Sequence, residues 1–284
     1  MARHSFFVDP AAMQGERVEL TSPIAHQIRS VLRLRPGDTV DLLDGSGCVH
    51  EARLVAVSRE GVVAEVVNRR LAHTEPGAEL VLYQALLKGE KMELVLQKGT
   101  EIGVSRFVPV LSERCVSRPG AADLERRIAR WQTIVREAAE QSKRGVLPGV
   151  APVEQFGAAC RSAAEGGVAL MAWEEERALG IGRVLAEAGL AGGRGPLGHG
   201  DARNERASPS ASDSASPRPA VRARPRVALL IGPEGGFSER EAETARGAGV
   251  RVVSLGPRIL RAETAALVAA TLVLCATGDL GGLG

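Results

Sequence analysis

The sequence predicts an α/β protein in two parts, a small β-barrel over residues 1–72 and an α/β domain with a parallel sheet over residues 78–284. Three patterns favour this class. Short strands separated by turns rich in Gly, Pro and Asp fill the first part, as in small barrels. Strands alternate with helices in the second part, which is typical of a parallel sheet. The strand at 227–231 is an uninterrupted apolar run, as expected for a strand buried on both faces.

The N-terminal part has five candidate strands and one short helix. Turn-forming residues separate strands at 35–38 and 44–47, where Gly, Pro and Asp favour chain reversal. We expect strands at 6–8, 17–20, 39–43, 49–57 and 62–67, and a helix at 26–32. Many short strands at this spacing predict a barrel with a modest core.

From residue 78 the predicted elements alternate. We expect strands at 79–87, 106–111, 168–172, 227–231 and 250–255. We expect helices at 90–103, 123–142, 181–188, 238–247 and 263–276. Asp123 is the expected N-cap of its helix, and Ser238 with Glu241 has the pattern of a capping box. The last helix is apolar on almost every side, so we expect it to be buried all round.

Residues 191–226 form a low-complexity segment inside the α/β part. The segment is rich in Ser, Pro and Gly, has few bulky apolar residues, and carries seven basic and three acidic residues. Such a composition cannot bury enough surface to offset the entropy of ordering. We therefore expect a disordered insertion, whose excess of positive charge suits contacts with phosphates.

Composition narrows the class of protein. Hydrophobic residues make up 44% of the chain, enough for a buried core, and no apolar run is long enough to cross a membrane. The apolar stretch 6–8 is too short for a secretory signal, so we expect a cytoplasmic protein with no membrane partner. The net charge of +2 gives no evidence for nucleic acid binding. No metal site is expected, because the five histidines are scattered and the four cysteines lack ligand spacing, the cysteines being Cys48, Cys115, Cys160 and Cys275.

Two glycine-containing loops near the C-terminus carry the strongest signal for a ligand site. Each follows a predicted parallel strand, and α/β proteins bind ligands at the carboxyl ends of such strands. Glycine lets the backbone approach a ligand closely and adopt positive φ, so backbone N–H and C=O groups there can recognise an adenine edge. The loops are Ile231-Gly232-Pro233-Glu234-Gly235-Gly236-Phe237 and Leu255-Gly256-Pro257-Arg258-Ile259-Leu260-Arg261-Ala262-Glu263-Thr264-Ala265.

The first loop by itself has other interpretations. A tight strand-to-helix turn without a ligand has the same composition. A dinucleotide-binding fingerprint fits poorly, because Pro233-Glu234 stands where that motif needs its second glycine. A carboxylate beside a pyrophosphate would also be repelled.

Taken together in this order and spacing, the two loops resemble the signature of the ribosomal RNA small subunit methyltransferase E family. Further segments along nearly the whole chain resemble it too. They are Lys88-Gly89-Glu90-Lys91-Met92-Glu93, Gln97-Lys98, Glu101-Ile102-Gly103-Val104, Ser112-Glu113-Arg114-Cys115, Glu137-Ala138-Ala139-Glu140-Gln141 and Gly278-Asp279-Leu280-Gly281, with Val31-Leu32-Arg33-Leu34 and Pro36-Gly37-Asp38 near the N-terminus. Residues 191–226 depart from the pattern, being longer than the family usually has there.

The resemblance implies a fold, a methyl donor and an assembly. The barrel would be PUA-like, and the α/β part would be a SPOUT domain whose C-terminal chain threads a deep trefoil knot, a rare topology. The protein would be a homodimer and would hold S-adenosyl-L-methionine in its knot loops. The implied donor-binding residues are Met171, Ala172, Trp173, Ile231, Gly232, Pro233, Glu234, Gly235, Leu255, Gly256, Ile259, Leu260, Thr264 and Ala265.

The implied reaction is methylation of N3 of a specific uridine in 16S ribosomal RNA of the small ribosomal subunit. N3 is protonated at neutral pH, so transfer needs its proton removed or the resulting anion stabilised. A guanidinium suits the charge that develops on O2 and O4, and Arg261 is the candidate. Glu234 or Glu263 would accept the proton or orient the arginine. The alternative for Arg261 is a structural salt bridge with Glu263.

Basic side chains outside the two loops are candidates for RNA contacts. Lys91 and Lys98 are seven apart and hence on one helix face. A solvated charged surface is the alternative for each candidate. The candidates are Arg3, Arg29, Arg33, Arg35, Lys88, Lys91, Lys98, Arg114, Arg136 and Arg144.

Three other functions stay open from the sequence. A related methyltransferase would modify ribose 2′-O or another RNA, and the identity of the methylated nucleoside distinguishes it. A non-catalytic RNA-binding assembly factor would use the barrel alone and would not bind the donor. A nicotinamide dehydrogenase would need the dinucleotide fingerprint that the first loop does not match.

Overall fold

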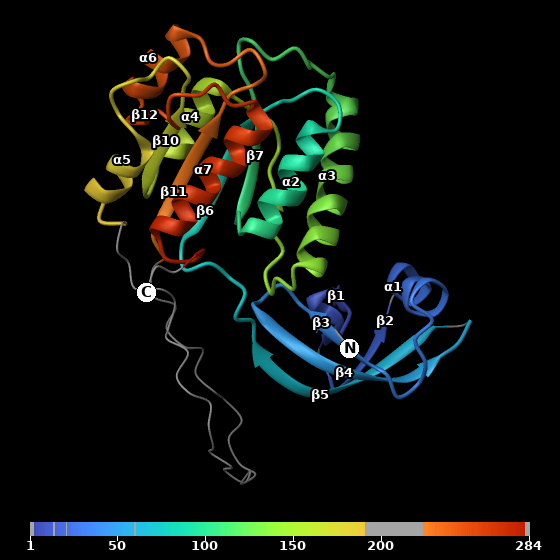
Figure 1. Cartoon of the computed structure of the whole chain (residues 1–284). Coiled ribbons are helices and arrows are strands. Elements are labelled where there is room, and N and C mark those ends of the chain that lie inside the picture. Colours follow the sequence, from blue (N-terminus) through green and yellow to red (C-terminus); the bar gives the residue numbers. More distant parts are fainter. Residues whose placement is uncertain (1–2, 14, 21, 60, 191–223, 282–284) are drawn as a thin grey trace.

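The computed structural model describes residues 3–13, 15–20, 22–59, 61–190 and 224–281 of the chain. A small curled sheet at the N-terminus lies beside a larger α/β body (Figure 1). Residues 191–223 of the predicted insertion lie outside the described part, so the disorder expected there stays a prediction.

The N-terminal sheet has five strands within the described residues. Their order is β1-β3-β4-β5-β2, and neighbouring strands are antiparallel except β1 and β3, which are parallel. The sheet curls around buried side chains that include Phe6, Ile28, Leu42 and Leu54. The predicted barrel is therefore a curled half-barrel. Its strands are β1 (Ser5–Phe7), β2 (Arg17–Leu20), β3 (Thr39–Leu43), β4 (Cys48–Val57) and β5 (Val62–Leu71).

The α/β body is built on a sheet of seven strands within the described residues, in the order β12-β10-β11-β6-β7-β8 with β9 also beside β7. Every pairing in it is parallel, which confirms the predicted class. The strands are β6 (Glu79–Ala85), β7 (Arg106–Leu111), β8 (Gly149–Val150), β9 (Glu154–Gln155), β10 (Val168–Ala172), β11 (Arg226–Ile231) and β12 (Arg251–Val253). The helices are α2 (Lys91–Ile102), α3 (Ala121–Gln141), α4 (Phe156–Ala164), α5 (Ile181–Glu187), α6 (Glu239–Gly247) and α7 (Ala262–Ala276).

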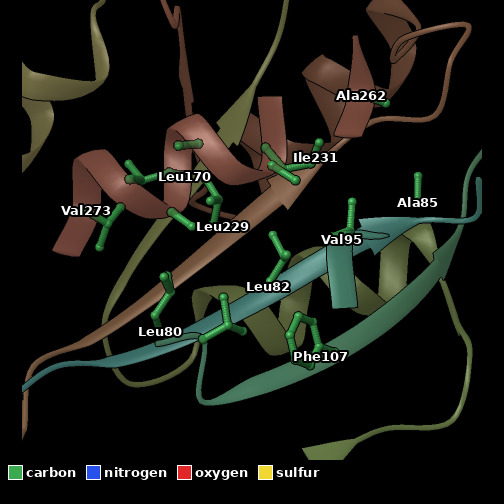
Figure 2. Packing of buried hydrophobic residues seen from close by; sticks show 14 of the residues in the cluster. Leu80, Leu82, Ala85, Val95, Phe107, Leu170, Leu229, Ile231, Ala262 and Val273 are labelled. Atoms are coloured by element: carbon green, nitrogen blue, oxygen red, sulfur yellow. The ribbon is translucent and has the colours of Figure 1, made fainter. Parts of the chain in front are cut away.

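Helices cover both faces of this sheet, which gives the body three layers (Figure 1). Along β6, Leu80 and Leu82 join the cluster under α2, α3, α5 and α7, whereas Val81 and Tyr83 join the cluster under α4 and α6. Figure 2 shows part of the first cluster, where side chains of β6 and β11 face those of α7. Burial on both faces explains why these strands are apolar without alternation.

Several predicted helix ends need correction. Asp123 is not an N-cap, because α3 begins at Ala121 and the extended residue Gly120 is its N-cap. The helix expected at 26–32 begins earlier, as α1 (Ser22–His26), and continues as one π-helical turn (Gln27–Val31). The capping box of α6 is confirmed, since Ser238 accepts from the backbone N–H of Glu241 and the Glu241 side chain accepts from the N–H of Ser238.

Two features of the helices were not foreseen. The α4 helix was missed because its buried side chains are mostly small, with Ala159, Cys160 and Ala163 fully buried. The α7 helix is not buried all round in the single chain. Its Leu272 is 39% exposed and Cys275 is also exposed, because no described element covers that side.

Polar contacts join the N-terminal sheet to the α/β body. The backbone N–H of Phe7 donates to Oε1 of Glu140 at 2.8 Å, and Arg136 donates to the Phe7 carbonyl at 3.2 Å. Burial raises the pKa of Glu140 despite that hydrogen bond. Arg144, only 3% exposed, pairs at 2.8 Å with Glu75, which lies between the two sheets in the sequence. The two contacts of Phe7 hold the half-barrel against α3.

Candidate functional site

A cavity of about 250 Å³ opens where β10, β11 and β12 end. The three strands are parallel, so the loops that follow them meet at one edge of the sheet, where α/β proteins bind ligands. Among the residues implied for donor binding, those that line this cavity are Ala172, Trp173, Ile231, Gly232, Pro233, Glu234, Leu255, Gly256, Ile259, Leu260 and Ala265.

Three implied donor-binding residues do not line the cavity. Met171 is fully buried within β10. Gly235 packs against Arg114, since a Cβ added at this glycine would lie 3.2 Å from the arginine's Cβ. Thr264 is exposed on α7. The structure thus places these three next to cavity residues along the chain but not in the wall.

The loop after β11 is held by hydrogen bonds from three sides. Arg114 Nη1 donates to the carbonyls of Gly235 and Phe237, at 3.1 and 3.4 Å. The Trp173 indole N–H donates to the same Phe237 carbonyl at 3.1 Å, and Gln84 donates to the Gly232 carbonyl at 3.3 Å. The loop is therefore preorganised by the protein itself.

Gly236 shows why this loop needs glycine. Its φ is +67°, and a Cβ there would clash with Oε1 of Glu174. A positive φ disfavours residues with a side chain, and the exposed Glu174 side chain would have to move to make room for one. Both constraints act on the backbone that forms the cavity wall.

Lys91 connects the two loops from the first residue of α2. Its Nζ lies 3.2 Å from Oε1 of Glu234 and 4.0 Å from Oε2 of Glu263. The same Glu234 oxygen accepts the backbone N–H of Lys88 at 3.1 Å. Burial alone would raise the pKa of Glu234, but the hydrogen bonds from Lys88 and Lys91 hold it below its ordinary value. Glu234 is therefore ionised at neutral pH.

Glu263 differs from Glu234 in its surroundings. Its Oε2 is buried and has no hydrogen-bond partner among the described residues, and the ammonium group of Lys91 is 4.0 Å away. An unsatisfied buried carboxylate oxygen is costly. The Glu263 side chain also lines the cavity, but this oxygen itself is enclosed by protein atoms.

Arg261 lies at the N-cap of α7 and lines the cavity. The alternative of a salt bridge with Glu263 is not supported, because in the described part of the chain the Arg261 guanidinium has no carboxylate within ion-pair distance. The side chain is exposed and its charge is free to face a ligand.

Some of the basic residues proposed for RNA contacts have other partners. Arg144 is a correction: it is buried, and Glu75 together with the carbonyls of Thr100 and Val104 satisfies its guanidinium. A guanidinium enclosed in this way cannot reach a phosphate. Lys91 lies in the cavity wall rather than on an outer helix face.

The remaining candidates lie nearer the surface. Lys98 pairs with Glu101 at 2.8 Å, and Arg3 pairs with Glu51 at 2.7 Å. Arg114 and Arg136 donate to backbone carbonyls, as described above, and Arg29 donates to the Ser58 carbonyl at 3.0 Å. Three candidates are exposed without such side-chain contacts in the described structure, namely Arg33, Arg35 and Lys88. RNA contacts by these surface residues stay predictions.

Seven cavity residues were not predicted from the sequence, namely Glu174, Arg177, Gly236, Ser254, Pro257, Arg258 and Ala262. Most lie within the two loops or directly after β10. Their position after parallel strands was a usable signal, because the loops after β10, β11 and β12 all contribute to the same cavity. Glu174 and Arg177 were not predicted because they lie in or next to the acidic stretch 174–176, which has the composition of an ordinary charged surface.

Within the described ranges, no group of three or more His, Cys, Asp and Glu side chains is arranged to hold a metal ion. Nor does any helix in those ranges have the length and apolar character needed to span a membrane.

Known families match most of the chain. The profile of the RNA methyltransferase domain matches residues 74–189 and 203–274, and that of the RNA methyltransferase PUA domain matches residues 20–67. The ribosomal RNA small subunit methyltransferase E of Synechocystis sp. is 33% identical over 263 residues, which cover 92% of this chain and 74% of that protein. The Bacillus subtilis protein of the same name is 28% identical over 271 residues, 94% of each chain.

Solved structures agree with the sequence matches. Ribosomal RNA small subunit methyltransferase E from Neisseria gonorrhoeae, bound to S-adenosyl methionine, has a TM-score of 0.75 to this chain, with 31% identity over 95% of each. A putative methyltransferase from Legionella pneumophila, also with bound S-adenosyl methionine, has a TM-score of 0.73 and 25% identity, covering 97% of this chain and 98% of that one. By its fold, its cavity-forming loops and these matches, the chain belongs to the ribosomal RNA small subunit methyltransferase E family.

Proposed function

We propose that this protein transfers the methyl group of S-adenosyl-L-methionine to N3 of a specific uridine in the 16S ribosomal RNA of the small ribosomal subunit. The observation that carries the proposal is the cavity at the ends of β10, β11 and β12, which combines apolar walls with the guanidinium of Arg261, unpaired among the described residues. Family membership supports methyl transfer to ribosomal RNA. The choice of N3 rests on the family resemblance and on the chemistry of the cavity residues.

The cavity fits a donor that carries a nucleoside. Trp173, Ile231, Leu255 and Leu260 supply apolar surface for an adenine ring. At Gly256, φ is +114° and no atom lies within 4 Å of where a Cβ would stand, so a ligand has room to approach the backbone there. When bound, the donor supplies an electrophilic methyl group on sulfur.

Arg261 is the residue that stabilises the uracil anion in this proposal. Loss of the N3 proton spreads negative charge onto O2 and O4, and a fixed guanidinium lowers the free energy of that charge. The position of Arg261 at the N-terminus of α7 adds the positive end of a helix dipole nearby.

Glu263 is the better of the two carboxylates to accept the N3 proton. Lys91 and the Lys88 backbone N–H occupy Oε1 of Glu234 and lower its pKa, which makes it a weaker base. Oε2 of Glu263 has no hydrogen-bond partner among the described residues. A general base needs a free oxygen within reach of the proton, and a turn of the Glu263 carboxylate would bring its unbonded oxygen toward the cavity.

The working form in this proposal is a homodimer in the cytoplasm, where ribosomal subunits assemble. The uncovered side of α7, with Leu272 at 39% exposure and Cys275 one turn further on, needs cover. A symmetric interface buries the same patch of both copies.

The experiment that tests the function supplies labelled donor with small ribosomal subunits, naked 16S rRNA and transfer RNA as separate acceptors. Transfer to 16S rRNA in either form supports the proposal, and transfer to transfer RNA alone contradicts it. Calorimetry with S-adenosyl-L-methionine adds a second readout. Absence of donor binding would favour the non-catalytic assembly factor.

A further inference from the structure

Two arginines at the cavity have no assigned role. Arg177 follows β10, and Arg258 lies in the loop after β12, so they approach the cavity from separate segments. Both are exposed, and among the described residues neither guanidinium makes an ion pair or a side-chain hydrogen bond. Other exposed arginines of this body do pair, as Arg183 with Glu187 at 2.9 Å and Arg246 with Glu176 at 3.4 Å.

An isoleucine stands next to one of these arginines. Ile259 is 83% exposed, more than any other large hydrophobic residue that the described structure leaves exposed. A single exposed apolar side chain is ordinary on a protein surface. This one, however, lines the cavity next to Arg258 and two positions before Arg261.

We propose that Arg177, Arg258 and Ile259 form an RNA-entry rim, a proposal that rests on the proposed function. The two guanidiniums would contact the phosphates that flank the target nucleotide. Ile259 would pack against the neighbouring base once the target is extruded.

Extrusion of the target base explains why the rim needs both charge and an apolar side chain. A stacked base cannot reach the floor of a cavity, so the nucleotide must rotate out of its stack. Rotation draws the flanking phosphates together, and arginine offsets their repulsion with bidentate hydrogen bonds. The gap left in the stack exposes an apolar base face, and aliphatic side chains fill such gaps in other nucleic-acid complexes.

The test compares Arg177→Gln, Arg258→Gln and Ile259→Ser with Arg240→Gln. The control Arg240 is an exposed arginine on α6 that does not line the cavity. For each variant, binding of 16S rRNA is measured at several salt concentrations, donor affinity by calorimetry, and methyl transfer in a single turnover at saturating RNA.

Each arginine variant should reduce the slope of log affinity against log salt by about 0.7 to 1, the value for one lost phosphate contact. Arg258→Lys should restore that slope, because lysine keeps the charge. Ile259→Ser should leave the slope unchanged but slow single-turnover transfer by roughly tenfold, equivalent to about 1.4 kcal/mol. Donor affinity is measured for each variant because all three side chains also line the cavity, so that a loss of donor binding is distinguished from a loss of RNA contacts.

If the salt slopes of the two arginine variants and the transfer rate of Ile259→Ser equal those of Arg240→Gln, the proposed rim is wrong. A loss of dimerisation in Ile259→Ser would also overturn it, because that result would assign the isoleucine to the interface between subunits. RNA affinity is measured without methyl transfer, so it tests the rim independently. Wild-type protein that methylates no ribosomal RNA would contradict the proposed function instead.

Discussion

Lys91 Nζ lies 3.2 Å from Oε1 of Glu234, an ion pair that joins the first turn of α2 to the loop after β11. The same carboxylate oxygen accepts the N–H of Lys88, so the start of α2 and this loop form one polar unit. The pair lies in the wall of the cavity proposed to hold the methyl donor. We therefore expect loop geometry, and with it donor affinity, to depend on a contact outside the glycine-rich motif.

Replacing Lys91 with Met should weaken donor binding by roughly fivefold, because a partly exposed ion pair contributes up to about 1 kcal/mol. Lys91→Arg keeps the charge and should bind the donor nearly as well as wild type. Calorimetry with S-adenosyl-L-methionine measures both. Equal affinity in wild type and Lys91→Met would show that the pair does not position the loop.

The same pair predicts a dependence on pH. The pKa of Glu234 lies below its ordinary value of 4.5, so its ion pair stabilises the folded loop above that value and is lost as the pH falls through the lower, folded-state pKa. Donor affinity should therefore hold from neutral pH down into the ordinary glutamate range. In Lys91→Met the decline should begin at higher pH, and an unchanged onset would contradict the role of the lysine.

Arg261→Ala should reduce turnover by about 10²- to 10³-fold, the usual effect of removing one donor to a developing anion. Donor affinity should change little, because the guanidinium acts on the acceptor base. Arg261→Lys should recover only part of the rate, because lysine keeps the positive charge but lacks the planar set of hydrogen-bond donors. Near-normal turnover of Arg261→Ala would remove this residue from the mechanism.

Arg144→Met should lower the free energy of unfolding by about 3–5 kcal/mol, because it leaves Glu75 buried without its partner. The double variant with Glu75→Gln should be more stable than Arg144→Met alone. Urea titration measures the change, with Arg183→Met as control, since the exposed pair of Arg183 with Glu187 contributes less than about 1 kcal/mol. A small effect of Arg144→Met would mean that water reaches the pair.

Leu272→Glu should convert a dimer into a monomer, because it places a charge on the uncovered side of α7. Light scattering measures the mass, and alkylation of Cys275 should become faster in the variant. Cys160 is the internal control, since burial raises the pKa of its thiol to about 12 and the neutral thiol reacts poorly. A wild-type monomer that remains active would refute the dimer.

The strands at 17–20, 39–43, 106–111 and 168–172 could be predicted to the residue because each depends on a local apolar pattern bounded by turns. The α4 helix could not, since its buried residues are mostly small, namely Ala159, Cys160 and Ala163 beside Phe156. The exposed side of α7 could not be predicted either, because an apolar helix can be covered by the same chain or by another one, and its sequence does not distinguish the two. The knotted path implied by the resemblance stays a prediction.

The loops of the candidate site could be located from glycines that follow strands, but the roles of basic residues could not. Arg144 and Glu75 are 69 positions apart, and Arg114 and Gly235 are 121 apart. A charge pattern along the chain does not show which distant carboxylate or carbonyl a guanidinium meets. For this reason the enclosure of Arg144 by Glu75 could not be predicted, and Arg144 was proposed as an RNA contact.

The most direct measurement is the identity of the nucleoside that receives the methyl group. Labelled donor is incubated with the enzyme and small ribosomal subunits or 16S rRNA, the RNA is digested to nucleosides, and the labelled product is identified by mass spectrometry. The proposed chemistry of Arg261 and Glu263 predicts 3-methyluridine, at a level that collapses in Arg261→Ala. A label found in 2′-O-methylated ribose, or in any base other than uracil, would contradict it.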